Sequence, residues 1–171
     1  MNRPALRPAG VLLAVGVALL SLAADAATKA WALSALRHGH RITPAWGLVR
    51  LQLVANHGAA FGIGASYEPL IVAVSFAGVI LLGLWALYPT SGAERFGAAL
   101  AAGGAAGNLA DRLARPPGRL HGAVIDWIHV SFYGPTFNLA DVWLRGGIVL
   151  AAAGWLWSRR SRAPERGPDT E

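Results

Sequence analysis

Four long apolar stretches, separated by more polar segments, dominate the chain, and they predict membrane-spanning helices. The clearest stretch runs from residue 70 to residue 87, without a charge and with Tyr67 and Tyr88 at its edges. Eighteen residues at 1.5 Å per residue nearly cross a hydrocarbon layer of about 30 Å, and tyrosine favours the two interfaces. Three further apolar runs cover residues 11–33, 96–113 and 137–157. We therefore predict an all-α membrane protein with four transmembrane helices.

The first run also allows a second interpretation. Arg3 and Arg7 precede an apolar core at residues 11–22, and Ala24-Asp25-Ala26 follows it, as in a cleavable secretory signal. The three apolar runs downstream favour a first helix that stays in place.

Two segments between these runs have an extended pattern. Residues 49–53 alternate between apolar and polar side chains, which predicts a strand. Residues 123–130 form a second short extended stretch before the fourth run. They lie in the two longer loops, residues 34–66 and 114–136.

Composition narrows the classes of protein that fit. The chain is 54% hydrophobic and only 14% charged, against about 25% charged in soluble domains, which excludes an ordinary soluble domain and disorder. It has no cysteine, so disulfides, thiolate metal sites and a cysteine nucleophile are excluded. Its net charge is +6, but the arginines lie mostly at the ends of apolar runs. Such placement indicates anchoring in a lipid bilayer rather than binding of nucleic acid.

The arginines also predict an orientation. Arg3 and Arg7 precede the first run, and Arg159 and Arg160 begin a basic polar tail at residues 159–171. Four spans place both ends on one side, which the positive-inside rule makes cytoplasmic. We expect residues 1–158 to form a single domain, with its longer loops on the other side.

Carboxylates gather at the face of the membrane opposite the termini. Spans of alternating direction bring Glu68, Asp111, Asp126 and Asp141 to that face, and Asp25 lies in the nearest half of the first span. An aspartate fully in hydrocarbon costs about 2.5–3.5 kcal/mol. A chain with so few charges is therefore expected to use these carboxylates.

A repeated tetrapeptide lies at this face. Asn108-Leu109-Ala110-Asp111 closes the third run, and Asn138-Leu139-Ala140-Asp141 opens the fourth. A spacing of three places the Asn and Asp of each copy on one helix face. The alternative is a pair of capping motifs with interhelical hydrogen bonds.

Asp126 and Asp141 together predict aspartic-protease chemistry. If they face each other, repulsion raises one pKa and the pair shares a proton. One carboxylate then takes a proton from water while the other protonates a carbonyl oxygen or leaving nitrogen. Arg112 either pairs with a carboxylate, holds a substrate carbonyl or anchors the helix. Arg145, one turn beyond Asp141, either lowers the pKa of that carboxyl group or extends toward the interface.

Other chemistries fit less well. The five histidines match no metal-binding signature, and no Gly-x-Ser-x-Gly elbow is present. Ser21 and Lys29 are too far apart for a Ser/Lys dyad, and we interpret Lys29 as interfacial. We predict no metal and no cofactor. A proton-coupled transporter and an inert membrane scaffold remain alternatives, although no inverted repeat supports a transporter.

Five blocks of residues, in order along the chain, resemble the lipoprotein signal peptidases, also called signal peptidase II. The blocks are Asp25-x-x-Thr28-Lys29, Asn56-x-Gly58-x-Ala60-Phe61-Gly62, Gly103-Gly104-Ala105-x-Gly107-Asn108-x-x-Asp111-Arg112, Val124-x-Asp126-Trp127-Ile128 and Phe137-Asn138-x-Ala140-Asp141. The resemblance covers about residues 10–158. Trp127, where Phe is usual, and the charge of Arg145 depart from the family pattern.

The resemblance implies a function and a set of roles. The enzyme would be an aspartic endopeptidase of the bacterial inner membrane that cleaves prolipoproteins just before a diacylglyceryl-modified cysteine, with globomycin as an inhibitor. Its four transmembrane helices would carry a small extracytoplasmic β-cradle. The roles implied are catalysis for Asp126 and Asp141, site shaping or substrate binding for Asn56, Gly58, Phe61, Asn108, Asp111, Arg112 and Asn138, and structural support for Asp25 and Lys29, with Asp111 contributing to that support. The alternative interpretation of the glycine-rich block around Phe61 is an ordinary hairpin.

Overall fold

The computed structural model describes residues 7–44, 47–58, 67–116, 118 and 120–161. Within these residues four long α-helices account for most of the chain. They are α1 (Pro8–Ala35), α2 (Glu68–Leu87), α3 (Gly92–Ala114) and α4 (Leu139–Arg160). Each of the four predicted apolar runs is a helix. The fourth helix begins two residues later than predicted, because Phe137 belongs to a strand and Asn138 caps the helix.

Helix α3 lies at the centre of the bundle and contacts the other three helices. Its alanines and glycines allow close approach: a Cβ on Gly97 would lie 2.5 Å from the backbone nitrogen of Ala151 in α4. Among the described residues, α1, α2 and α4 are long and apolar enough to cross a membrane. Helix α3 falls outside that group, since small residues and the polar side chains Glu94, Asp111 and Arg112 replace large apolar ones. Its neighbours bury these polar groups.

A three-stranded antiparallel sheet adjoins one end of the bundle. Its order is β1 (Val49–Asn56), β2 (Val124–Val130) and β3 (Thr136–Phe137). A short 3-10 helix, η1 (Arg37–Gly39), lies between α1 and β1. The extended patterns at 49–53 and 123–130 are thus confirmed, whereas β3 was not predicted. In the β1–β2 ladder Asn56 pairs with Val124 and Val54 with Asp126.

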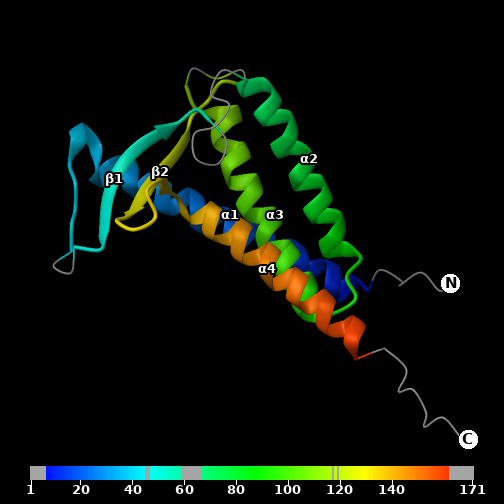
Figure 1. Cartoon of the computed structure of the whole chain (residues 1–171). Helices are drawn as coiled ribbons and strands as arrows, with labels where there is room; N and C mark the ends of the chain where they lie inside the picture. The colour runs from blue at the N-terminus through cyan, green and yellow to red at the C-terminus, as the bar shows by residue number, and fades with distance from the viewer. Residues whose placement is uncertain (1–6, 45–46, 59–66, 117, 119, 162–171) are drawn as a thin grey trace, which may run out of the picture.

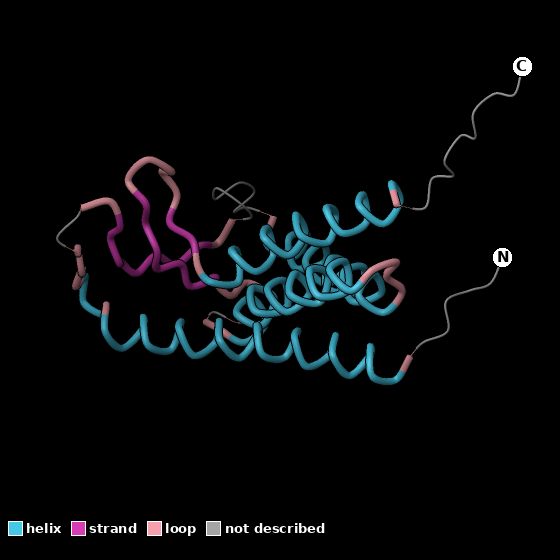
Figure 2. Tube along the Cα trace, turned by 90° about the horizontal axis from the view of Figure 1, so that it is seen from below, coloured by secondary structure: helices cyan, strands magenta, loops and turns pink. Residues whose placement is uncertain are grey.

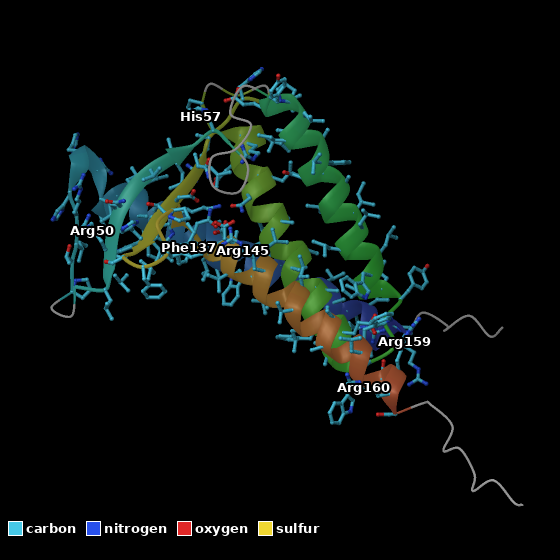
Figure 3. The ribbon with its side chains drawn as sticks, in the orientation of Figure 1. Arg50, His57, Phe137, Arg145, Arg159 and Arg160 are labelled. Atoms are coloured by element: carbon cyan, nitrogen blue, oxygen red, sulfur yellow. The ribbon has the colours of Figure 1, made fainter. Side chains whose placement is uncertain are left out.

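The sheet lies far from the start of α1 and from the end of α4. Figure 1 shows the sheet at one end of the helices and both the start of α1 and the end of α4 at the other, and the view from below in Figure 2 agrees. Arg159 and Arg160 lie at that far end, opposite Arg50 and His57 (Figure 3). The start of α1 and the end of α4 are therefore on one side of the molecule, as predicted, and their cytoplasmic location stays a prediction.

Candidate active site

An open hollow of about 290 Å³ lies between α2, α3, α4 and the sheet. Asp126, from β2, and Asp141, from the first turn of α4, both line it. The predicted site residues that share this lining are Asn56, Asn108 and Arg112. The topology thus brings together residues separated by as much as 85 positions in the chain.

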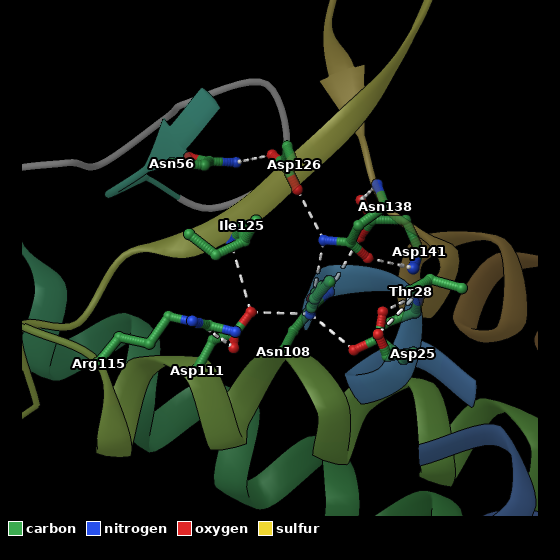
Figure 4. A network of polar contacts seen from close by, with 12 residues as sticks. Asp25, Thr28, Asn56, Asn108, Asp111, Arg115, Ile125, Asp126, Asn138 and Asp141 are labelled. Carbon is green, nitrogen blue, oxygen red and sulfur yellow. Dashed lines mark hydrogen bonds and ion pairs between the residues drawn. The ribbon is translucent and has the colours of Figure 1, made fainter. Parts of the chain in front are cut away.

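Both oxygens of Asp126 accept hydrogen bonds from amide side chains. Asn56 Nδ2 donates to Oδ2 at 2.9 Å, and Asn138 Nδ2 donates to Oδ1 at 2.6 Å (Figure 4). The Asp126 residue is only 2% exposed. Burial raises the pKa of Asp126 to about 6; the charge of Asp141 acts in the same direction, and the two amides act against it.

Asp141 is held from both α3 and the start of its own helix. Asn108 Nδ2 donates to Asp141 Oδ1 at 3.0 Å. The Asp141 backbone N–H donates to Asn138 Oδ1, while Asp141 Oδ2 accepts from the Asn138 backbone N–H, which completes a capping box. The expectation that Asn138 and Asp141 share a helix face is therefore wrong, because Asn138 is the N-cap. The capping alternative is right for this second copy.

Lys29 joins the two carboxylates that support the site. Its Nζ lies 2.7 Å from Asp25 Oδ2 and 2.8 Å from Asp111 Oδ2, and it donates to Asn108 Oδ1 at 3.1 Å. The Lys29 side chain is 1% exposed, so the interpretation of Lys29 as interfacial is wrong. The tertiary fold supplies two anionic partners, and their attraction offsets the cost of removing the ammonium group from water.

Each of these carboxylates also fixes the backbone beside one member of the candidate dyad. Asp25 Oδ1 accepts from the backbone N–H of Ala140, the residue before Asp141. Asp111 Oδ2 accepts from the backbone N–H of Ile125, the residue before Asp126. The buried ion pairs therefore link the positions of the two aspartates through α1 and α3 (Figure 4).

Arg112 donates two hydrogen bonds within the described part of the chain, and both acceptors are backbone carbonyl oxygens. Its Nη2 donates to the carbonyl of Gly58 at 2.5 Å and its Nη1 to the carbonyl of His57 at 3.5 Å. The Gly58 N–H in turn donates to Asn56 Oδ1 at 3.0 Å. Because the Arg112 residue is 5% exposed, it is not an interfacial anchor. Phe61, the remaining predicted residue of this block, lies outside the described residues.

Arg145 borders the hollow one turn beyond Asp141 and donates from Nη1 to the Tyr133 hydroxyl at 2.7 Å. The Tyr133 ring packs edge-on against Phe137, with centroids 5.7 Å apart. Figure 3 places Phe137 and Arg145 where the sheet meets α4. The sequence indicated neither contact, because both depend on the unpredicted β3.

Sequence reasoning also missed the wall that α2 contributes. Ser75 and Gly78 line the hollow, and their spacing of three on one face of an apolar helix was the available signal. Among the described residues, no group of three or more His, Asp or Glu side chains is arranged to hold a metal ion. The absence of a metal stays a prediction.

Comparison with known proteins identifies the family. The sequence profile described as "Signal peptidase (SPase) II" matches residues 17–157. The chain belongs to the signal peptidase II family. This confirms the resemblance drawn from the five blocks.

Relatives and solved structures agree with this membership. The chain is 38% identical to a lipoprotein signal peptidase of Bifidobacterium adolescentis over 75% of its length, and 36% identical to one of Mycolicibacterium smegmatis over 84%. These matches span 67% and 60% of the respective relatives. A structure described as a bacterial membrane enzyme, solved at 2.3 Å, superposes with a TM-score of 0.75 at 22% identity, covering 98% of this chain and 99% of the other. A second bacterial membrane enzyme, solved at 1.9 Å, has a TM-score of 0.68 at 23% identity and covers 90% and 96%. Both structures have the same fold as this chain.

Proposed function

We propose that the chain is a membrane-embedded aspartic endopeptidase that removes the signal peptide from diacylglyceryl-modified prolipoproteins. Cleavage falls just before the lipid-modified cysteine. The observation that carries this proposal is the placement of Asp126 and Asp141 in one hollow, each with amide donors on its carboxylate. Family membership supplies the substrate class, since the relatives are named lipoprotein signal peptidases.

The dyad would activate water without a cofactor. Two nearby carboxyl groups titrate as a pair, and the raised pKa of Asp126 favours retention of one proton near pH 6. The ionised carboxylate takes a proton from water as the water oxygen forms a bond to the scissile carbonyl carbon. The protonated partner donates to the carbonyl oxygen. Collapse of the tetrahedral intermediate breaks the C–N bond, and the leaving amine takes up a proton from the dyad.

The surrounding residues would shape the site. Asn56, Asn108 and Asn138 orient the two carboxylates, and their amides are placed to meet a substrate backbone that enters the hollow. Arg112 holds the turn that contains Gly58, next to the block that contains Phe61. Both aspartates are supported by the buried ion pairs that Lys29 forms with Asp25 and Asp111.

The membrane would present the substrate to this hollow. In this proposal α3 also crosses the bilayer, which makes four spans in total. The other three helices, α1, α2 and α4, shield it from lipid. The termini are cytoplasmic, and the sheet forms the extracytoplasmic cradle of a bacterial inner-membrane enzyme. A diacylglyceryl group confines the cysteine to the membrane surface, and confinement raises the effective concentration of the scissile bond at the dyad.

A purified-protein assay tests this function. The chain in detergent or nanodiscs is incubated with a diacylglyceryl-modified precursor, and mass spectrometry identifies the product. We expect one cut immediately before the modified cysteine, inhibition by globomycin, and no cut in the same precursor with its cysteine replaced by serine. Failure to shorten the modified precursor, or a cut at another bond, contradicts the proposal.

A further inference from the structure

Glu68, the first residue of α2, connects two segments of the chain that lie on either side of the dyad. Its Oε1 lies 2.9 Å from His57 Nδ1, and its Oε2 lies 2.6 Å from His121 Nδ1. His57 follows the last residue of β1, and His121 belongs to the segment between α3 and β2. We call this arrangement the clasp. Glu68 was predicted to lie at this face of the membrane, but neither it nor the two histidines was assigned a role.

The clasp lies at the end of the β1–β2 ladder that is nearest the dyad. Asn56 and Val124 form the terminal pair of that ladder. His57 is the next residue on one strand, and His121 precedes Val124 by three residues on the other. Glu68 therefore ties the two chains together just beyond the terminal pair. Asp126 lies only two residues farther along β2.

A continuous set of hydrogen bonds leads from His57 to Asp126. Arg112 donates to the carbonyls of His57 and Gly58, and the Gly58 N–H donates to Asn56 Oδ1. With Oδ1 fixed in this way, Asn56 Nδ2 faces Asp126 Oδ2 at 2.9 Å. The position of the His57 backbone thus governs how the Asn56 amide meets the carboxylate.

The second arm of the clasp is attached to the end of α3. Gly122, which follows His121, donates its N–H to the Arg112 carbonyl at 3.1 Å. A Cβ on Gly122 would lie 2.5 Å from the carbonyl oxygen of Asp111, so the chain packs directly on the helix there. A shift of His121 would therefore move the entry to β2.

The clasp is exposed enough to respond to the pH of the medium. The His57 and His121 side chains are 45% and 46% exposed, and that of Glu68 is 19% exposed. Histidine changes charge near neutral pH, and its protonation makes a hydrogen bond to a carboxylate charge-assisted. Among the residues that the structure describes, Arg112 of α3 also acts on Glu68, and its attraction is present at every pH in this range. Exposed ion pairs are individually weak, so we expect an effect of several-fold.

We propose that Glu68 is a positioning residue whose clasp with His57 and His121 holds the Asn56 amide on Asp126, more firmly as the histidines are protonated. Its consequence for cleavage rests on the proposed function, whereas the clasp itself does not. The variants E68A and E68Q test it. The matched control is H38A, because His38 is exposed in η1 at a distance from the dyad.

Hydrogen–deuterium exchange of residues 47–58, corrected for the intrinsic effect of pH, measures the clasp without any substrate. In the wild-type chain and in H38A we expect exchange to slow several-fold between pH 8 and pH 5.5. In E68A and E68Q this dependence should be weaker, because Asp126 still titrates in these variants. The same series with D126N and D126N/E68Q removes the titration of Asp126. Equal pH dependence in D126N and D126N/E68Q overturns the proposal.

Kinetics measure the consequence for the dyad. At pH 6 we expect E68A and E68Q to lower kcat about three- to tenfold with little change in KM, and at pH 8 all variants should approach the wild type. A loss of the same size at both pH values would indicate a merely structural role and contradict the proposal. If the wild-type chain cleaves nothing, the proposed function fails, and the exchange experiment still decides whether the clasp exists.

Discussion

The side-chain amide of Asn138 donates to Asn108 Oδ1 at 3.0 Å, and this bond joins the two copies of the repeated tetrapeptide. Each of these asparagines also donates to one carboxylate: Asn138 to Asp126 and Asn108 to Asp141. The two aspartates are therefore linked through a pair of amides that bond to each other. This arrangement fixes the separation of the aspartates through two neutral amide side chains.

Substitutions of Asn138 separate its role as a helix cap from its role at the dyad. N138S keeps an N-cap hydroxyl but is too short to reach Asp126, whereas N138A loses both functions. We expect N138A to destabilise the protein by about 1 kcal/mol, with N138S close to the wild type. Both variants should lower kcat about 10- to 100-fold. Thermal melting and steady-state kinetics check this, and a fully active N138S contradicts it.

Removal of the Lys29 charge should be severe. K29M leaves Asp25 and Asp111 close together in the protein interior without their shared cation. Loss of one partner from a buried ion pair costs about 3–5 kcal/mol. We expect a large drop in melting temperature, partly restored in K29M/D25N/D111N, which removes the charges together. A K29M variant as stable as the wild type would show that the buried charges do not depend on Lys29.

The pattern of apolar residues was sufficient to predict the helices, because each run is long and its ends carry charge or proline. It was also sufficient to bring Asp111, Asp126 and Asp141 to one end of the bundle. It did not predict β3, since two residues carry no periodicity. Phe137 was consequently assigned to the fourth helix.

Contacts between side chains that are far apart in the sequence were harder to predict. The burial of Lys29 depends on Asp111, which is 82 positions away. The clasp depends on two loops that meet at Glu68. Arg112 was a candidate for three roles, and the donation to backbone carbonyls that the structure shows was not among them, because it requires the path of the chain after β1. No local pattern specifies such a path.

The raised pKa of Asp126 predicts a dependence of stability on pH. Because the folded value is about 6 and the ordinary value is 3.8, the folded state binds more protons between these pH values. The favourable contribution is complete below pH 3.8 and is lost as the pH rises through about 6. The difference of roughly two units corresponds to at most about 3 kcal/mol.

D126N isolates this contribution. We expect the melting temperature of the wild type, relative to that of D126N, to fall between pH 4 and pH 7. Melting curves in one detergent at matched ionic strength measure the difference. A difference that is constant with pH, or that changes in the opposite direction, would show that burial of Asp126 does not raise its pKa.

Gly104 should be intolerant of any side chain. A Cβ there would lie 2.5 Å from the Ala140 carbonyl oxygen, so α4 must move at the residue before Asp141. We expect G104A to lose roughly 1–3 kcal/mol of stability and most of its activity. G83A is the matched control, because nothing lies within 4 Å of a Cβ at Gly83 in α2. Equal melting temperatures and activities for the two variants would contradict the close packing of α3 on α4.

The central claim is that both aspartates carry out the cleavage. Its most direct test is the turnover of a diacylglyceryl-modified precursor by purified D126N and D141N, each shown to be folded. E94Q is the control for loss of a buried carboxylate, since Glu94 lies at the other end of α3 and accepts from Trp85 and Thr90. The account predicts that D126N and D141N each lose activity by about a thousandfold or more, while E94Q retains it. Turnover by either aspartate variant at the wild-type rate would contradict the account.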